Sequence, residues 1–392
     1  MTNSRTTASR QQGFSLVEVM VGIVIALIAV LVIYQVFSVS EGIKRNATGA
    51  GDAQQNGLLS TFTMMLQGSN AGANIAVVGE ELDTCPADTD IKSTLRPIPV
   101  LIHDSGSDTV SDNFVANYGA SQRLVTSVDF ASAPTVTVAD PYVVQSPLGF
   151  QVNDFVVVMS PDAGGAGHCA RSMVTATTAA DGDGYVTLTH SAPVASPASD
   201  TTTTYDGHAT LLNLGPAPRR IRFQVDETNG TLGCVDLLGI DTIPPSPCAN
   251  AGGAAVPISN NVVLMKVQYG LADPNTGYLQ KWVKGSNDGT EDWTDSTVLA
   301  KDFVELSRIK AIRIALIVRS ESYDKCAYAD VCPDPTTNRF SYTLFDQCDG
   351  IPCPAAISGT LDPTPGKGNF RYRVYETVVP LRNAVWNLHK KT

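Results

Sequence analysis

Eight cysteines are the side chains of this sequence that can form covalent cross-links. They are Cys85, Cys169, Cys234, Cys248, Cys326, Cys332, Cys348 and Cys353. The sequence has no Cys-x-x-Cys motif, and the adjacent His168 and Cys169 lack partners at zinc-ligand spacing, so disulfides are favoured over a zinc site. Such bonds indicate an oxidising compartment. We expect one bond between Cys234 and Cys248 and two among the last four cysteines, whose three connectivities the sequence leaves open.

Oxygen-bearing side chains gather in one stretch of the C-terminal third and could bind a calcium ion. They are Asp273, Asn275, Asn287, Asp288, Glu291 and Asp292, with Gly277 among them. Their spacing does not match an EF-hand loop, and Asp, Asn and Gly are also the residues that tight turns require. We therefore expect solvated turns here and no metal site.

No arrangement of side chains in this sequence predicts catalysis. The five histidines occur singly and are interpreted as surface or loop residues: His103, His168, His190, His208 and His389. Neither a Walker loop nor a Gly-x-Ser-x-Gly motif occurs. Trp282, Trp293 and Trp386 could mark a contact surface, but core packing is the favoured interpretation. The sequence predicts a protein that is not an enzyme and needs no cofactor.

The formal net charge of −11 limits the kinds of partner. A nucleic-acid surface needs clustered Lys and Arg to neutralise phosphates, and no basic patch occurs after residue 50. Acidity of this size is typical of an exported domain that must stay soluble. We expect no nucleic-acid partner.

Glu18 is a carboxylate inside a long apolar run. Residues 14–39 read FSLVEVMVGIVIALIAVLVIYQVFSV, and at about 1.5 Å per residue such a helix spans the core of a bilayer. A carboxylate near the start of a membrane helix costs on the order of 3 kcal/mol unless it finds a partner. Glu18 either sits at the headgroup level, where the helix dipole favours it, or has an ion-pair partner in the membrane.

A short basic segment precedes the apolar run. Residues 1–13 contain Arg5 and Arg10 and no acidic residue, so the positive-inside rule places them in the cytoplasm. An ordinary secretory signal has a shorter apolar core and a small-x-small cleavage site on its far side. This segment lacks that site, so we expect the chain to be cut in front of the run.

The helical pattern continues beyond the apolar run. Apolar residues recur at helical spacing in Ile43, Ala47, Ala50, Leu58, Phe62, Met65 and Leu66. The spacing predicts a helix that continues to about Leu66. Four glycines, Gly42, Gly49, Gly51 and Gly57, each weaken it by about 1 kcal/mol relative to alanine, so we expect a bend or local melting.

Short β-type runs separated by Gly, Pro, Asp and Asn make up the rest of the chain. We predict strands at residues 124–130, 135–138, 155–159, 185–190, 221–225, 262–271, 309–319, 342–345 and 370–381, with a short helix at 298–307 and an exposed loop at 192–204. In the last strand, Phe370, Tyr372 and Val374 are predicted to form an apolar face, with Arg371, Arg373 and Tyr375 on the polar one.

Together these patterns predict an α+β fold, in which a long N-terminal transmembrane helix precedes a disulfide-bonded, mainly antiparallel β body. The predicted divisions are a cytoplasmic leader at 1–13, a helix at 14–66 with its transmembrane part at about 14–39, a β-rich variable region at 67–260 and a second β-rich region at 261–392.

The N-terminal residues carry a specific resemblance. Gly13, Phe14, Ser15, Leu16, Val17 and Glu18, preceded by Arg10 and followed by the apolar run, resemble the prepilin leader-peptidase site of type IV pilins and pseudopilins. The resemblance implies cleavage between Gly13 and Phe14 by a membrane aspartyl prepilin peptidase, followed by N-methylation of Phe14. Glu18 would then be the fifth residue of the mature chain. In that family, this glutamate pairs with the N-terminal amine of a neighbouring subunit.

A second resemblance lies in the C-terminal region. The segments VQYGLAD at 267–273, IKAIRIALIVRS at 309–320 and FRYRVYETVVPLRN at 370–383 look like the body of PilW-type minor pilins. This resemblance implies a minor pilin that joins a priming or tip complex of a type IV pilus. Its partners would be the prepilin peptidase, major and minor pilins, the inner-membrane assembly platform and membrane lipid. Its body would lie in the periplasm, and at the cell surface after assembly.

Two other functions fit the same sequence. A minor pseudopilin of a type II secretion system, similar to the J-type subunit, would share the leader. A pilus-mounted adhesin would use the Thr-, Ser- and Gly-rich middle region as its binding module. Whether the pilus serves motility, adhesion or DNA uptake is left open.

Overall fold

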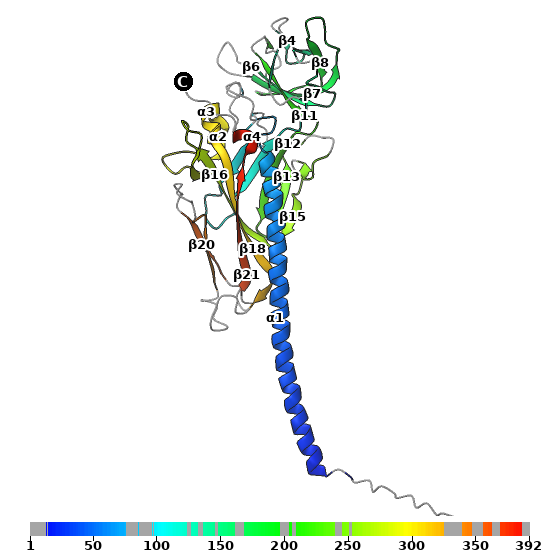
Figure 1. Ribbon diagram of the computed structural model, residues 1–392, viewed down its shortest axis with the longest axis vertical. Helices are drawn as coiled ribbons and strands as arrows, with labels where there is room; N and C mark the ends of the chain where they lie inside the picture. The colour runs from blue at the N-terminus through cyan, green and yellow to red at the C-terminus, as the bar shows by residue number, and fades with distance from the viewer. Residues whose placement is uncertain are drawn as a thin grey trace, which may run out of the picture. The chain divides into compact units, whose positions relative to one another are not determined.

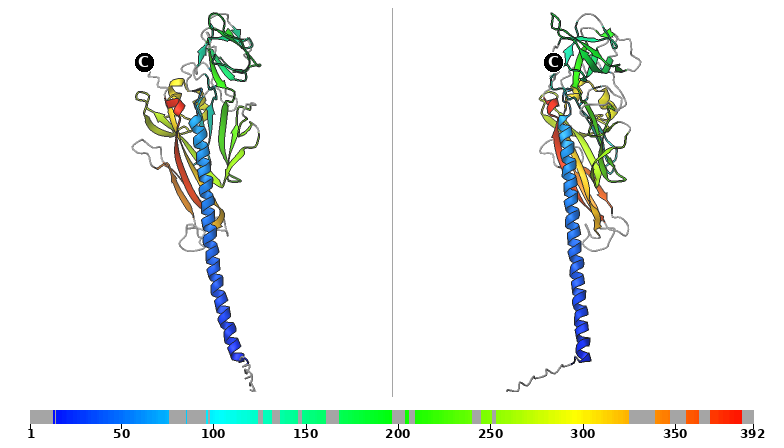
Figure 2. Two further views of the ribbon diagram at one scale, coloured as in Figure 1. Left: turned by 45° about the vertical axis from the view of Figure 1, so that its right-hand side comes forward. Right: turned by 90° about the vertical axis from the view of Figure 1, so that its right-hand side faces the viewer.

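The fold was obtained as a computed structural model (Figures 1 and 2), which describes residues 13, 15–75, 85, 96, 98–123, 127–131, 136–145, 148–160, 168–196, 204–205, 209–239, 245–250, 253–324, 339–346, 356–362 and 369–385. One long helix precedes a body of β-strands, which are antiparallel apart from one parallel pair in the described part of the chain. The predicted α+β fold class is therefore confirmed. The chain divides into two compact units, Met1–Gly51 and Asp52–Thr392.

Helix α1 (Leu16–Asn70) begins in the first unit and continues into the second. Its side chains from Leu16 to Arg45 are all exposed, and the apolar part has a mean hydropathy of 3.1 over 18 residues. By length and composition this segment can cross a membrane. The helix ends at Asn70 and not at Leu66, and it runs uninterrupted through the glycines that were expected to weaken it.

The C-terminal part of α1 packs on the body through one face. Ala53, Gly57, Ser60, Met64 and Gly68 are buried, and their spacing of three or four residues places them along one side of the helix. A Cβ atom on Gly57 would lie 2.1 Å from Cε2 of Tyr375, and one on Gly68 would lie 3.1 Å from Cγ1 of Val379. Glycine at position 57 is therefore required by the close approach of a tyrosine ring.

We predict that Gly57→Ala destabilises the body by about 1–3 kcal/mol, because the added methyl group overlaps the Tyr375 ring. Gly51→Ala on the same helix is the matched control. A Cβ at Gly51 meets nothing within 4 Å, so alanine should stabilise the helix by up to about 1 kcal/mol. Thermal unfolding of the detergent-solubilised chain, followed by circular dichroism, measures both. Equal midpoints for the two variants, or no relief of Gly57→Ala by Tyr375→Leu, would contradict the packing explanation.

The packed part of α1 lies beside two sheets, and a hairpin covers the far face of the second one (Figure 1). The first sheet consists of β1 (Val100–His103), β2 (Asn113–Tyr118), β12 (Arg219–Asp226), β13 (Thr231–Asp236), β14 (Ala249–Asn250) and β15 (Val256–Asn260). The second has the order β17 (Leu279–Lys284), β16 (Val262–Ala272), β18 (Ile309–Asp324), β21 (Asn369–Pro380). The hairpin consists of β19 (Phe340–Leu344) and β20 (Ile357–Leu361).

Helix α1 contacts both of these sheets. The hydroxyl of Ser60 is hydrogen-bonded to that of Ser259 in β15, and the hydroxyl of Tyr375 in β21 donates to the Ala53 carbonyl oxygen at 3.4 Å. The two sheets and this part of α1 share one large hydrophobic core. Burial of the apolar helix face in that core is what fixes α1 to the body.

The middle of the chain forms further sheets with a core of their own. Their strands are β3 (Val128–Asp129), β4 (Val136–Thr137), β5 (Tyr142–Val144), β6 (Phe155–Ser160), β7 (His168–Thr177), β8 (Val186–His190), β9 (Val194–Ser196), β10 (Thr204–Tyr205) and β11 (Thr210–Gly215). A separate cluster of buried side chains, from Phe130 to Leu211, fills this region. The predicted variable region at 67–260 thus contributes to two cores, because its first and last parts supply the first sheet of the main core.

Two local predictions were wrong. The expected loop at 192–204 contains strand β9, which pairs with β7 through Ala195 and Ala170. The helix expected at 298–307 is two helices, α2 (Asp295–Ala300) and α3 (Phe303–Leu306). The break has a local cause, since Asp302 is extended and its side chain accepts a hydrogen bond from the Glu305 backbone N–H, which starts a new helix.

The predicted faces of the last strand were also partly wrong. Tyr375, assigned to the polar face, packs against α1, while Val374 on the opposite face is 38% exposed. The cause is that the two faces of β21 are covered by different elements at different positions along the strand. The β19–β20 hairpin covers one face near Tyr372, whose ring centroid lies 5.0 Å from that of Phe340, and α1 covers the other face from Tyr375 onward.

Candidate functional site

The N-terminal part of the chain holds the residues predicted for processing and assembly. Gly13 is exposed, and Phe14 lies outside the described residues. Glu18 occupies the first turn of α1, where the helix dipole favours a negative charge. Its carboxylate is exposed and has no hydrogen-bond or ion-pair partner among the described residues of its own chain.

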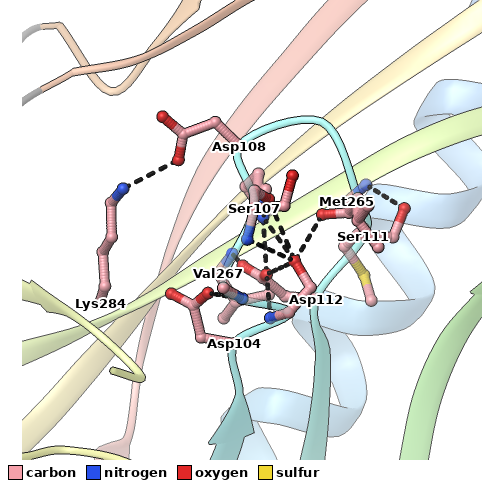
Figure 3. A network of polar contacts seen from close by, with 12 residues as sticks. Asp104, Ser107, Asp108, Ser111, Asp112, Met265, Val267 and Lys284 are labelled. Atoms are coloured by element: carbon pink, nitrogen blue, oxygen red, sulfur yellow. Dashed lines mark hydrogen bonds and ion pairs between the residues drawn. The ribbon is translucent and has the colours of Figure 1, made fainter. Parts of the chain in front are cut away.

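A buried ion pair joins the two sheets of the body (Figure 3). The ammonium Nζ of Lys266, in β16, lies 2.8 Å from Oδ1 of Asp112 and also donates to the Ser107 carbonyl oxygen at 2.6 Å. Oδ2 of Asp112 accepts the Val267 backbone N–H at 3.0 Å. The Lys266 and Asp112 side chains are only 2% and 1% exposed. Burial raises the pKa of the Asp112 carboxyl, and the Lys266 ammonium opposes that rise.

The same network holds the loop between β1 and β2 in place. Ser105 in this loop donates its backbone N–H to Asp112 at 3.1 Å. Asp108 forms an outer ion pair with Lys284 of β17 at 2.9 Å, as Figure 3 shows, and its carbonyl oxygen accepts the Tyr342 hydroxyl at 3.0 Å. The contacts join the first sheet, the second sheet and the hairpin. Sequence reasoning missed this network, although a lysine inside the apolar run VVLMKVQYGL of β16 was a signal for it.

A second polar contact lies on the same face of the second sheet. Nε of Arg313 donates to Oε1 of Gln268 at 2.8 Å, and its guanidinium lies 4.9 Å from the Trp282 ring centroid and 4.5 Å from that of Phe345. Burial lowers the pKa of Arg313 to about 10. The Phe345 backbone N–H donates to Oε1 of Glu376 at 2.9 Å. These contacts secure the hairpin to the sheet, which is a structural role.

Two family models match the two parts of the chain that this geometry singles out. The model of a prokaryotic N-terminal methylation motif matches residues 8–34, which include Gly13 and Glu18. The model of Type IV Pilus-assembly protein W matches residues 239–383, which contain all four strands of the second sheet. In these two parts the chain resembles a PilW-like type IV pilin. No curated protein and no solved structure matches it significantly.

This resemblance indicates the broad class of protein. Pilin-like families are structural proteins, and the methylation motif with its apolar helix fits a membrane-anchored pilin. A concave strip on the exposed membrane segment is lined by Leu27, Val30, Leu31, Tyr34, Gln35, Ser38 and Val39.

The acidic residues considered for calcium stabilise turns in this pilin. Oδ1 of Asp273 accepts the Asn275 and Thr276 backbone N–H groups, both at 2.9 Å. Hydrogen bonds from the Thr290 side chain and from the turn backbone lower the pKa of Asp288 to about 2. Asp292 accepts both the backbone N–H and the hydroxyl of Thr294. In the described ranges, no three His, Cys, Asp or Glu side chains are placed to hold a metal ion.

Two disulfides lie in the described residues. Cys234 is bonded to Cys248 as expected, with Cα atoms 5.3 Å apart. Cys85 is bonded to Cys169, with Cα atoms 5.2 Å apart, a pair that the sequence did not suggest. The other four candidates, Cys326, Cys332, Cys348 and Cys353, lie outside the described residues. The long bond joins residues 84 positions apart, so only the folded chain could reveal it.

The remaining aromatic and histidine candidates have structural surroundings. Trp282 and Trp293 are buried, so the core interpretation was right for both. His103 lies 2.9 Å from Asp295, and the His190 ring stacks on Tyr142 at 4.0 Å. His168 belongs to β7, while His208, His389 and Trp386 lie outside the described residues.

Proposed function

We propose that this pilin is a minor pilin that takes part in type IV pilus assembly, in a priming or tip complex. The observation that carries the proposal is the match to a pilus-assembly protein over the second sheet, on a chain whose exposed apolar helix carries the methylation motif. The protein would act by association with other subunits. No step of catalysis is assigned to it.

The N-terminal residues have defined roles in this proposal. A prepilin peptidase cuts between Gly13 and Phe14, which removes residues 1–13, and Phe14 is then N-methylated. Glu18 pairs with the N-terminal amine of a neighbouring pilin, which supplies a cation that the described residues of its own chain do not. Pairing in the low dielectric of the membrane favours one register between neighbouring helices.

The body would reside in the periplasm before assembly and at the cell surface afterwards. Its disulfides support this location, because such bonds persist in the oxidising periplasm. The inner-membrane assembly platform and the other major and minor pilins would be its partners. Within the body, the close packing of Gly57 against Tyr375 holds the C-terminal part of α1 on the second sheet.

Deletion of the gene in its host tests the proposal. Surface pili are quantified by shearing, and secreted enzymes are quantified in the medium of the same cultures. We expect lost pili with normal secretion, restored by the intact gene. Lost secretion with normal pili would instead identify a minor pseudopilin of a type II secretion system. No change in either would contradict both and leave an adhesin role.

A further inference from the structure

The buried pair of Lys266 and Asp112 holds an amine against a carboxyl group away from water. Nζ of Lys266 lies 2.8 Å from Oδ1 of Asp112, so the carboxyl carbon is at most one C–O bond further away. The two residues are 154 positions apart in the sequence. Asp112 ends the loop before β2, and Lys266 lies in the middle of β16. Reacting groups held together in this way behave as if present at about 10⁵–10⁸ M.

Burial also favours the condensation of these two groups. In water, a carboxylate and an ammonium do not condense, because hydration stabilises both charges. The Lys266 and Asp112 side chains are only 2% and 1% exposed, so most of that hydration is lost. Burial raises the pKa of the Asp112 carboxyl, and the negative charge of Asp104 in the same loop adds to the rise. An amide carries no charge, so its formation removes the cost of two buried ions.

The surroundings of the pair can satisfy the amide that would form. Its N–H would donate to the Ser107 carbonyl oxygen, which Nζ of Lys266 already contacts at 2.6 Å. Its carbonyl oxygen would accept the Val267 backbone N–H, which Oδ2 of Asp112 already accepts at 3.0 Å. An amide of this kind has one N–H donor and one carbonyl acceptor. Both would therefore have a partner in the core without a change of fold.

We propose that Nζ of Lys266 and Cγ of Asp112 join in an intramolecular isopeptide bond. In the ion pair, Nζ carries three hydrogens. When the N–C bond forms, two of them leave with one carboxyl oxygen as water, the third stays on the amide nitrogen, and the two charges cancel. The step needs no oxidant, reductant or other reactant. The ion pair is the state from which the bond forms, and Lys266→Met removes both.

The bond would give the body a covalent link that reducing agents do not cleave. It would join the loop between β1 and β2 of the first sheet to β16, an inner strand of the second sheet. The two described disulfides make other connections, Cys85 to Cys169 and Cys234 to Cys248. This inference concerns the body alone and does not rest on the proposed minor-pilin function.

Peptide mass mapping of the full-length protein from its native membrane tests the bond. The chain is reduced, denatured and digested with trypsin, which does not cleave after an amide-linked lysine. We expect the Asp112 peptide joined to the Lys266 peptide, one water lighter than their sum, at least about tenfold above the unlinked peptides. Fragment spectra locate the linked residues. The absence of this linked peptide, with both parts found free, would overturn the proposal.

The outer pair of Lys284 and Asp108 is an internal control in the same digest. Its nitrogen and oxygen lie 2.9 Å apart, but its side chains are 30% and 45% exposed. Water therefore hydrates both charges, and this pair should stay unlinked. An equal yield of a link between Lys284 and Asp108 would show condensation that does not depend on burial, and it would also overturn the proposal.

Lys266→Arg separates the bond from the charge. Arginine keeps the cation beside Asp112, but its guanidinium stays protonated and does not form the amide. We expect the linked peptide to disappear, and the reduced, denatured variant to migrate more slowly on a gel than the unsubstituted chain. A bond across 154 positions keeps the unfolded chain more compact. Lys284→Arg is the matched control and should migrate like the unsubstituted chain. Equal mobility of all three would overturn the proposal, however well Lys266→Arg folds, because the chains are compared unfolded.

Discussion

Replacing Lys266 with methionine is expected to lower the free energy of unfolding of the body by about 3–5 kcal/mol. The substitution leaves the Asp112 carboxylate buried at 1% exposure without the ammonium that lies 2.8 Å away. It also removes the hydrogen bond to the Ser107 carbonyl oxygen, which holds the loop between β1 and β2. Urea unfolding of the detergent-solubilised chain, followed by near-ultraviolet circular dichroism, measures the change.

Two further variants separate the buried pair from an ordinary ion pair. Lys284→Met breaks the outer pair with Asp108, whose side chains are 30% and 45% exposed, and should cost no more than about 1 kcal/mol. The double variant Lys266→Met with Asp112→Asn should recover part of the loss, because it removes the uncompensated charge while an amide oxygen still accepts the Val267 N–H. Equal costs for Lys266→Met and Lys284→Met would contradict this account.

Replacing Glu18 with alanine is expected to lower the amount of this pilin in sheared pili by about 100-fold. An ion pair that offsets the cost of a carboxylate in the membrane is worth on the order of 3 kcal/mol, and its loss corresponds to about 100-fold because about 1.4 kcal/mol is a factor of ten. Glu18 has no such partner among the described residues of its own chain. Immunoblots of sheared pili and of membranes measure incorporation, and the shift in mass on leader removal measures processing, which should stay normal.

The charge of Glu18 can be separated from its size. Glu18→Gln keeps the size and removes the charge, so it should fail to assemble like the alanine variant. Gln35→Ala changes another polar residue of the same apolar run and should alter incorporation by less than about twofold. Recovery of the alanine variant from sheared pili at the normal level would show that Glu18 has no partner in the filament. The helix dipole would then be sufficient reason for its position.

Features that depend on neighbouring residues could be predicted from the amino-acid sequence. The apolar run with Glu18 and the leader pattern around Gly13 each consist of consecutive residues. A single family model matches residues from both. The long strands β16, β18 and β21 were found because their apolar runs are strong and local. Short strands such as β9 were missed, because two or three residues carry too little periodicity to compete with a loop of small polar residues.

Features that join distant segments of the chain became visible only in the folded protein. Gly57 was expected only to weaken the helix, yet the Tyr375 ring, more than 300 residues later in the chain, makes glycine a packing requirement. The bond between Cys85 and Cys169 and the contact of Lys266 with Asp112 likewise join segments far apart in the sequence. Local propensity does not specify which distant surfaces meet, because burial and close packing of the whole body select them.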